Sequence, residues 1–207
     1  MRVWLGYLSC MADAADDDRR RSIGARRNPD AQEAILQAGE AILLEDGPAA
    51  FSIEAVARRA RAGKPTIYRW WPSRGTLLLD IYHRQKPQAL HGPTDDLEGE
   101  IAGLIEWLSG YWQGNAGQVF RQVIAEAQRD PACAERLQNY AVERRGHIAE
   151  MIERARTRGE VPDTVDPLLG GEMVQSLIWH RLLTDRLALQ PGEAQKIAAQ
   201  LVRGLRA

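Results

Sequence analysis

From residue 30 onward, capping residues, glycines and prolines divide the chain into segments whose apolar residues recur at helical spacing. No segment alternates β-branched and polar residues in the way that a half-buried strand requires. The sequence therefore predicts an all-α fold. Four short helices are expected between Asp30 and Pro87. Four or five longer helical stretches follow, over roughly residues 95–113, 116–129, 131–158, 167–187 and 191–205.

Three regions are expected along the chain. Residues 1–29 are predicted to be a disordered basic arm, because the stretch DAADDDRRRSIGARRNPD has hardly any apolar residue to bury. Residues 30–86 are expected to form a small helical domain, and residues 95–207 a larger one. The first fourteen residues leave three interpretations open: a weak signal peptide, a flexible tail, or an upstream start with Met11 as the true first residue.

Positive charge is concentrated in one part of the chain. The formal net charge of the 207 residues is -1, yet residues 19–74 contain eleven lysines and arginines against six acidic residues. Because binding of a polyanion depends on local charge, this segment is the candidate for contact with nucleic acid. The two cysteines, Cys10 and Cys133, are too few for a disulfide framework and are typical of a protein of the reducing cytoplasm.

The stretch FSIEAVARRARAGKPTIYRWW, residues 51–71, has the pattern of a short helix, a tight turn and a second short helix. Ile67 and Trp70 are expected to face back from the second helix toward the first. Gly63 is expected to cap the second helix, and Pro65 fits its first turn, where a missing N–H costs nothing. This layout is that of a helix-turn-helix, whose second helix enters the major groove of DNA.

The other side chains of the second helix are polar and are expected to be exposed. Amino and guanidinium groups there offer donors to phosphates or guanine edges, and hydroxyls offer donors to phosphate oxygens. The alternative is a solvated cationic helix in an ordinary bundle. The predicted contacts with double-stranded DNA are Lys64, Thr66, Tyr68, Arg69, Ser52 and Arg61.

The arm before the first helix is rich in arginine. We expect these side chains to add phosphate or minor-groove contacts, and the alternative is a solvated tail. The arginines concerned are Arg19, Arg20, Arg21, Arg26 and Arg27.

Residues 30–82 resemble the DNA-binding domain of the tetracycline-repressor (TetR) family of bacterial regulators. The resemblance is carried by ILQAGEAILLEDGPAAFSIEAVARRA and GKPTIYRWWPSRGTLLLDIY, and it covers about a quarter of the chain. It implies a transcriptional regulator, by the habit of the family a repressor, that binds a palindromic operator as a homodimer and is released by a small-molecule effector. One departure is Arg61, which stands where the family usually has glycine. A non-glycine residue in a left-handed turn costs roughly 1 kcal/mol or more.

The resemblance also implies a ligand cavity between the C-terminal helices. That region is rich in aromatic residues and methionines, and a ligand site needs apolar walls with a few polar groups. The alternative is that aromatic residues at helical spacing form only the core. The predicted wall residues are Trp107, Phe120, Met151 and Trp179.

The two final helices are predicted to join two copies of the chain in a four-helix bundle, as the resemblance also implies. Each helix carries an apolar stripe at helical spacing, and Ala194 and Ala198 are expected to let the partner subunit approach closely. The alternative is that both stripes pack inward. The predicted interface residues are Met173, Leu177, His180, Ile197, Leu201 and Leu205.

Other chemistry has little support in the sequence. The four histidines lack the spacing of metal ligands, and no catalytic or phosphate-binding motif is present, so we expect no metal, no cofactor and no enzyme. No apolar run approaches the length of a membrane span. Cys133, near a helix start, is either a small helix residue or a redox sensor. The two other function classes are an architectural protein that binds DNA broadly without an effector and, with less support, a helical enzyme.

Overall fold

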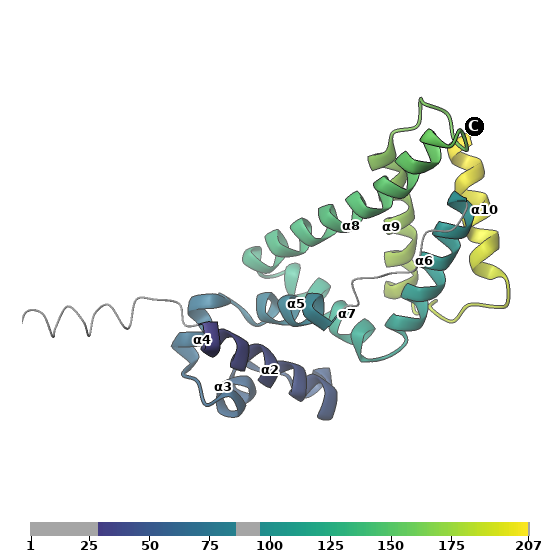
Figure 1. The fold of residues 1–207 in the computed structure, drawn as a ribbon. Helices are drawn as coiled ribbons and strands as arrows, with labels where there is room; N and C mark the ends of the chain where they lie inside the picture. Colours follow the sequence, from purple (N-terminus) through teal and green to yellow (C-terminus); the bar gives the residue numbers. More distant parts are fainter. Residues whose placement is uncertain (1–28, 86–95, 207) are drawn as a thin grey trace, which may run out of the picture.

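The computed structural model describes residues 29–85 and 96–206, and every regular element in these two ranges is a helix (Figure 1). Residues 1–28 of the arm, with Cys10 and the five arginines predicted to contact DNA, lie outside the described residues. The all-α prediction is therefore confirmed for the part of the chain that can be described. The elements are α2 (Pro29–Glu45), the short 3-10 helix η1 (Pro48–Ala50), α3 (Ile53–Ala60), α4 (Lys64–Trp70), α5 (Arg74–Gln85), α6 (Leu97–Trp112), α7 (Asn115–Ala127), α8 (Pro131–Thr157), α9 (Pro167–Leu183) and α10 (Glu193–Arg206).

Helices α2 to α5 form the N-terminal unit, at the lower left of Figure 1. Each helix contributes at least one fully buried apolar side chain to a shared core, including Ile35, Val56, Ile67 and Leu78. Burial of such side chains stabilises a fold by roughly 1.5–3 kcal/mol each. This core fixes how α3 and α4 are held against α2 and α5.

Trp71, and not Trp70, is the tryptophan that anchors α4. Helix α4 ends at Trp70, and Trp71 takes an extended conformation with φ -126° and ψ 103°. The change of conformation turns the Trp71 side chain into the core, where it is 1% exposed, whereas Trp70 is half-buried. Trp70 packs against the core as a partly buried side chain, as expected, and Trp71 is the more deeply buried of the two.

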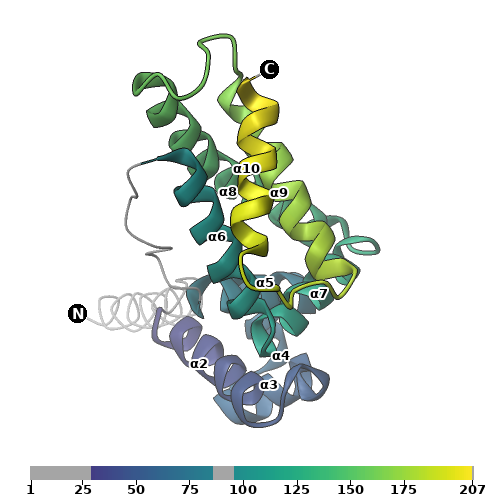
Figure 2. The same cartoon turned by 90° about the vertical axis from the view of Figure 1, so that its right-hand side faces the viewer.

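Helices α6 to α10 form the larger C-terminal unit, in which α8 packs along α9 and α10 packs along α6 (Figures 1 and 2). Close approach of α9 to α8 depends on Gly171, because a Cβ atom at this position would lie 2.8 Å from the backbone oxygen of Arg145. Helix α9 ends at Leu183, four residues earlier than expected. Asp185 there adopts a left-handed conformation, and the N–H of Arg186 bonds to the carbonyl of Arg181.

Several polar contacts connect the two units, and most of them involve the segment that follows α4. Arg74 donates to the Phe51 carbonyl and to Gln122 and Glu126 of α7. Asp80 of α5 accepts hydrogen bonds from Trp71 at 2.7 Å and from Arg136 of α8 at 2.8 Å. The indole of Trp112 in α6 donates to the hydroxyl of Tyr82 in α5 at 2.9 Å. In addition, Asn115 of α7 donates to the backbone carbonyl of Leu43 in α2 at 3.2 Å. The N-terminal unit is thus tied to α6, α7 and α8 of the C-terminal unit.

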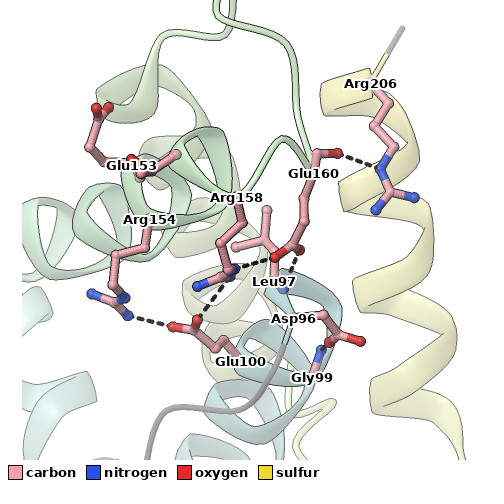
Figure 3. A network of polar contacts seen from close by, with 10 residues as sticks. Asp96, Leu97, Gly99, Glu100, Glu153, Arg154, Arg158, Glu160 and Arg206 are labelled. Atoms are coloured by element: carbon pink, nitrogen blue, oxygen red, sulfur yellow. Dashed lines mark hydrogen bonds and ion pairs between the residues drawn. The ribbon is translucent and has the colours of Figure 1, made fainter.

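A buried carboxylate holds the far end of the C-terminal unit together (Figure 3). Glu100 of α6 is 1% exposed and accepts hydrogen bonds from Arg154 and Arg158, near the end of α8. Arg158 also pairs with Glu160, whose side chain accepts from the N–H of Leu97 at 2.7 Å. The backbone carbonyl of Glu160 accepts from Arg206 of α10. The ends of α6, α8 and α10 therefore meet in one polar network.

Candidate DNA-binding surface and ligand cavity

The second helix of the helix-turn-helix, α4, is positioned by its two ends. Gly63 caps its N-terminus in an extended conformation, and proline occupies its first turn, as the sequence predicts. Ile67, in the middle of the helix, is fully buried, and Trp71 is buried directly after its end. With these two side chains held in the core, the opposite face of α4 is exposed to solvent.

The exposed face of α4 carries three of the predicted DNA contacts. Lys64, Tyr68 and Arg69 are exposed, and 48% of the Tyr68 surface is accessible, which is unusual for so large a side chain. Thr66 is half-buried. The face thus presents two cations and an aromatic ring with a hydroxyl, a combination that can contact phosphates and base edges.

Lys64 is held by a carboxylate that the sequence analysis did not single out. Its ammonium group lies 2.5 Å from Glu54 in the first turn of α3, and both side chains are at least half exposed. The hydrogen bond between them raises the pKa of Lys64 and lowers the pKa of Glu54. Exposed ion pairs are worth only about 0–1 kcal/mol, so exchanging Glu54 for a phosphate costs little.

The two predicted contacts outside α4 have structural roles in α3. The hydroxyl oxygen of Ser52 caps α3 by accepting a hydrogen bond from the N–H of Ala55 at 3.1 Å, which leaves its O–H able to donate. Arg61 ends α3 in the left-handed conformation, with φ 51° and ψ 36°, and its side chain is exposed. The turn therefore keeps the geometry that glycine usually provides, at the expected cost of roughly 1 kcal/mol.

A small cavity of about 30 Å³ lies among α6, α8 and α9. Its walls are mostly apolar or aromatic, and its basic side chains are Arg144 and His147 of α8. A second, open hollow of about 330 Å³ lies between α8 and α9, and it shares Gln175 and Trp179 with the cavity. The residues that line the inner cavity are Leu104, Leu108, Trp112, Tyr140, Arg144, His147, Ile148, Gln175, Ile178 and Trp179.

Of the four predicted wall residues, only Trp179 lines this cavity. Phe120 is fully buried, with its ring stacked on Tyr82 and set edge-on to Trp179. Met151 is also buried away from the cavity, and Trp107 stacks on Tyr111 with ring centroids 5.2 Å apart. The aromatic content pointed to the right region, but helical spacing could not tell which aromatic face meets an open space and which meets another ring.

The predicted dimer stripe lies on α9 and α10, two neighbouring helices that are seen side by side in Figure 2. Met173 and His180 are exposed, and Leu177, Ile197 and Leu201 are half-buried along an open groove between the two helices. Leu205, also half-buried, packs near Gly170 of its own chain. Ala194 and Ala198 are buried within the chain, where α10 packs against α6, so the expectation that they face a partner is wrong.

Cys133 lies in the core and not at a reactive surface. It is fully buried in α8, with its thiol directed at the carbonyl of Val123 at 3.7 Å. Burial, together with the nearby charges of Asp130 and Glu126, raises the pKa of Cys133 to about 11. The thiol is therefore protonated at neutral pH, which favours the structural interpretation of this residue over a redox sensor.

These features define a helix-turn-helix DNA-binding protein with a helical C-terminal domain, and comparison with known proteins agrees. The family model "Bacterial regulatory proteins, tetR family" matches residues 35–81, and "Tetracyclin repressor-like, C-terminal domain" matches residues 92–201. The chain therefore belongs to the TetR family of transcriptional regulators, which are DNA-binding proteins and not enzymes.

Individual relatives agree with this assignment. The chain is 26% identical to the HTH-type transcriptional regulator YdeS of Bacillus subtilis, over 77% of this chain and 82% of that protein. It is 25% identical to the DNA-binding transcriptional repressor TetR of Mycobacteroides abscessus, over 72% and 80% of the two chains. The crystal structure of the TetR family regulator SCO0332 superposes with a TM-score of 0.70 at 25% identity, covering 84% of this chain and 97% of that one. In the described part of this chain, no helix is long and apolar enough to cross a bilayer.

Proposed function

We propose that this regulator is a repressor that binds a palindromic operator as a homodimer through α4, and that a small molecule in the C-terminal domain releases it. The observation that carries the proposal is the division of α4 into two faces. Ile67 is buried, while Lys64, Tyr68 and Arg69 are exposed on a helix that Trp71 anchors at its end. The half-exposed aromatic ring of Tyr68 lies between two cations and outside the described core, and it suits a major groove.

Replacing Tyr68 with alanine tests the role of this face. Operator fragments are first selected from genomic DNA with the unmodified protein, and affinity is then measured by fluorescence anisotropy. We expect Tyr68→Ala to weaken specific binding by about 1–3 kcal/mol, because contacts of its ring and hydroxyl are lost. Tyr68→Phe separates the two contributions. Unchanged affinity of a folded Tyr68→Ala protein would remove α4 from its role as recognition helix.

Arg69, on the same face of α4, is tested through the salt dependence of operator binding, with a second arginine as the matched control. If Arg69 contacts a phosphate, Arg69→Ala should reduce the slope of log affinity against log salt by about one unit. Arg203→Ala removes the same charge from α10, at the end opposite the N-terminal unit in Figure 2, and should leave the slope unchanged. Equal slopes for both variants would mean that Arg69 makes no phosphate contact.

Dimerisation through α9 and α10 is supported by the exposed stripe on these helices. One recognition helix reads only a few base pairs, so specificity needs a second copy on a symmetric half-site. Exposed Met173 and the groove formed by Leu177, Ile197 and Leu201 place apolar surface on one side of the C-terminal domain. Such a patch is what a self-associating surface requires.

A charge in this groove should separate the subunits. Leu201 is half-buried in the monomer, so Leu201→Asp can keep the fold while placing a carboxylate in the proposed interface. We expect a loss of roughly 2 kcal/mol or more of dimerisation free energy, with poor binding to the full operator. Sedimentation measures the oligomeric state. A wild-type monomer at micromolar concentration, alone and on DNA, would refute the interface.

The proposed route from ligand to DNA runs through aromatic contacts. Trp112 and Tyr140 line the cavity and both contact Tyr82 of α5, by a hydrogen bond and by an edge-on ring contact at 5.9 Å. A ligand that moves either wall residue would therefore act on the helix that follows α4. The coupling needed is roughly 1–3 kcal/mol. An architectural protein would instead bind DNA broadly, with no compound altering its affinity.

A further inference from the structure

The cavity among α6, α8 and α9 contains a cationic donor that its surroundings do not satisfy. The side chain of Arg144 is 16% exposed, and its guanidinium group lies 5.4 Å from the centre of the Tyr140 ring. Its Nε atom is buried and makes no hydrogen bond, while its Nη2 atom pairs with Glu143. Leaving a buried donor unpaired costs about 1–3 kcal/mol, so this edge of the guanidinium is prepared to bind an acceptor.

The groups around Arg144 do not supply that acceptor. Burial raises the pKa of the neighbouring Tyr140 to about 12, so its phenol stays neutral. Burial raises the pKa of Glu143, but its hydrogen bond with Arg144 and the positive charges near it lower the pKa by more in sum. The net shift of the Glu143 pKa is therefore downward. Glu143 is ionised, but it reaches only Nη2 and is 44% exposed, on the side of α8 that faces His83 of α5. The rest of the cavity wall is aliphatic or aromatic, apart from His147 and Gln175.

We propose that the cavity binds an apolar or aromatic molecule that carries one carboxylate, with the carboxylate on the Nε and Nη2 edge of Arg144. A carboxylate matches this edge of a guanidinium with two parallel hydrogen bonds, which a neutral group cannot reproduce. The aromatic walls formed by Trp112, Tyr140 and Trp179 receive the apolar body of the ligand. This inference rests on the proposed function, because it identifies the chemistry of the effector.

The size of the site requires that one wall moves. A cavity of about 30 Å³ holds no more than a water molecule, whereas ligand sites start near ~300 Å³. The outer hollow between α8 and α9 has about 330 Å³, and only Gln175 and Trp179 are common to the two walls. Displacement of these two side chains joins the hollows. The apolar body then extends outward from a carboxylate that is held inside.

Binding at Arg144 also reaches the DNA-binding unit. A carboxylate on the Nε and Nη2 edge competes with Glu143 for Nη2. Glu143 lies 3.8 Å from the imidazole of His83, which belongs to α5. The ligand therefore changes a contact between α8 and the helix that follows the recognition helix, in addition to moving Trp112 or Tyr140.

Matched acids and amides test the inference on the full chain. Isothermal titration calorimetry is carried out with benzoate, 2-naphthoate and decanoate, each beside its primary amide, which has nearly the same shape without the charge. At least one acid is expected to bind about tenfold or more tightly than its amide, as a charge-assisted pair requires. Equal affinities within every pair, or no binding of any acid at millimolar concentration, would overturn the inference without any variant.

Two adjacent arginines then locate the site. Arg144→Met should abolish the preference for the acid, because methionine keeps the apolar stem and removes the guanidinium. Arg145→Met is the control, since the Nε atom of Arg145 is also buried and unpaired, but Arg145 lines only the outer hollow and pairs with Glu172 at 3.2 Å. A preference that survives in a folded Arg144→Met protein, or that depends on Arg145 instead, would assign the anion to another place.

Operator affinity, measured with and without each compound, separates this inference from the proposed function. An acid that binds through Arg144 but leaves operator affinity unchanged supports the anion site and refutes effector control. Release of the operator by the amides as readily as by the acids supports effector control and refutes the anion site.

Discussion

Trp71→Ala is expected to lower the free energy of unfolding of the N-terminal unit by about 3–5 kcal/mol and to abolish operator binding at moderate temperature. The side chain is 1% exposed, so its removal leaves a cavity in the small core that supports α4. The indole also donates to Asp80 at 2.7 Å, and Asp80 then keeps only the pairing with Arg136 of α8. Because α4 ends directly before Trp71, the loss falls on the helix that is proposed to read DNA. Urea denaturation followed by far-UV circular dichroism measures the change without relying on tryptophan fluorescence.

Trp70→Ala is the matched control for this prediction. The two residues are adjacent, and their ring centroids are 6.1 Å apart, but Trp70 is only half-buried. Its loss should cost less than about 2 kcal/mol, in proportion to the smaller apolar area that it removes from water. Equal destabilisation by the two substitutions would contradict the conclusion that Trp71 alone anchors α4.

The helix-turn-helix could be predicted from the sequence because its determinants are local. Ser52 as a cap, Gly63 before Pro65, and an apolar residue at Ile67 each act within a few residues of their own position. The structure shows the expected cap at Ser52, the expected start of α4 and the left-handed Arg61. The deeper burial of Trp71 compared with Trp70 could not be predicted from the helical period. A helical period places Trp70 near Ile67, but the helix stops there, and the chain turns its next side chain inward.

The cavity and the contacts between the two units could not be predicted from the sequence, because they depend on how helices that are distant in the sequence pack against one another. Phe120 and Trp179 look equivalent as aromatic residues on helices, yet only Trp179 lines the cavity. Arg144 gave no signal of its own in a chain with many arginines. Its significance appears only when its Nε atom is found buried without an acceptor in a side chain that also lines the cavity. Similarly, the pairing of Asp80 with Arg136 joins residues 56 positions apart.

The network around Glu100 should show a stability effect of similar size at the opposite end of the molecule. The partners in this network differ in burial: Glu100 is buried, whereas the side chains of Arg154 and Arg158 are 47% and 33% exposed. Removing both guanidinium groups takes these two counter-charges away from a carboxylate in the interior, which costs about 3–5 kcal/mol. Removing the carboxylate instead leaves two cations that can extend into water. We therefore expect the double variant Arg154→Ala/Arg158→Ala to be far less stable than Glu100→Gln.

Chemical denaturation of both variants, with Glu150→Gln as an exposed control on α8, measures the difference. Glu100→Gln keeps the shape of the side chain and part of its hydrogen bonding, so its cost should stay near 1–1.5 kcal/mol, a value of roughly one hydrogen bond. Because Glu160 contacts both Arg158 and Arg206, the double variant should also loosen the end of α10, which would appear as faster amide hydrogen exchange near Arg206. If Glu100→Gln proved as destabilising as the double variant, the stability of this end would come from the shape and hydrogen bonds of Glu100, and not from the compensation of a buried charge.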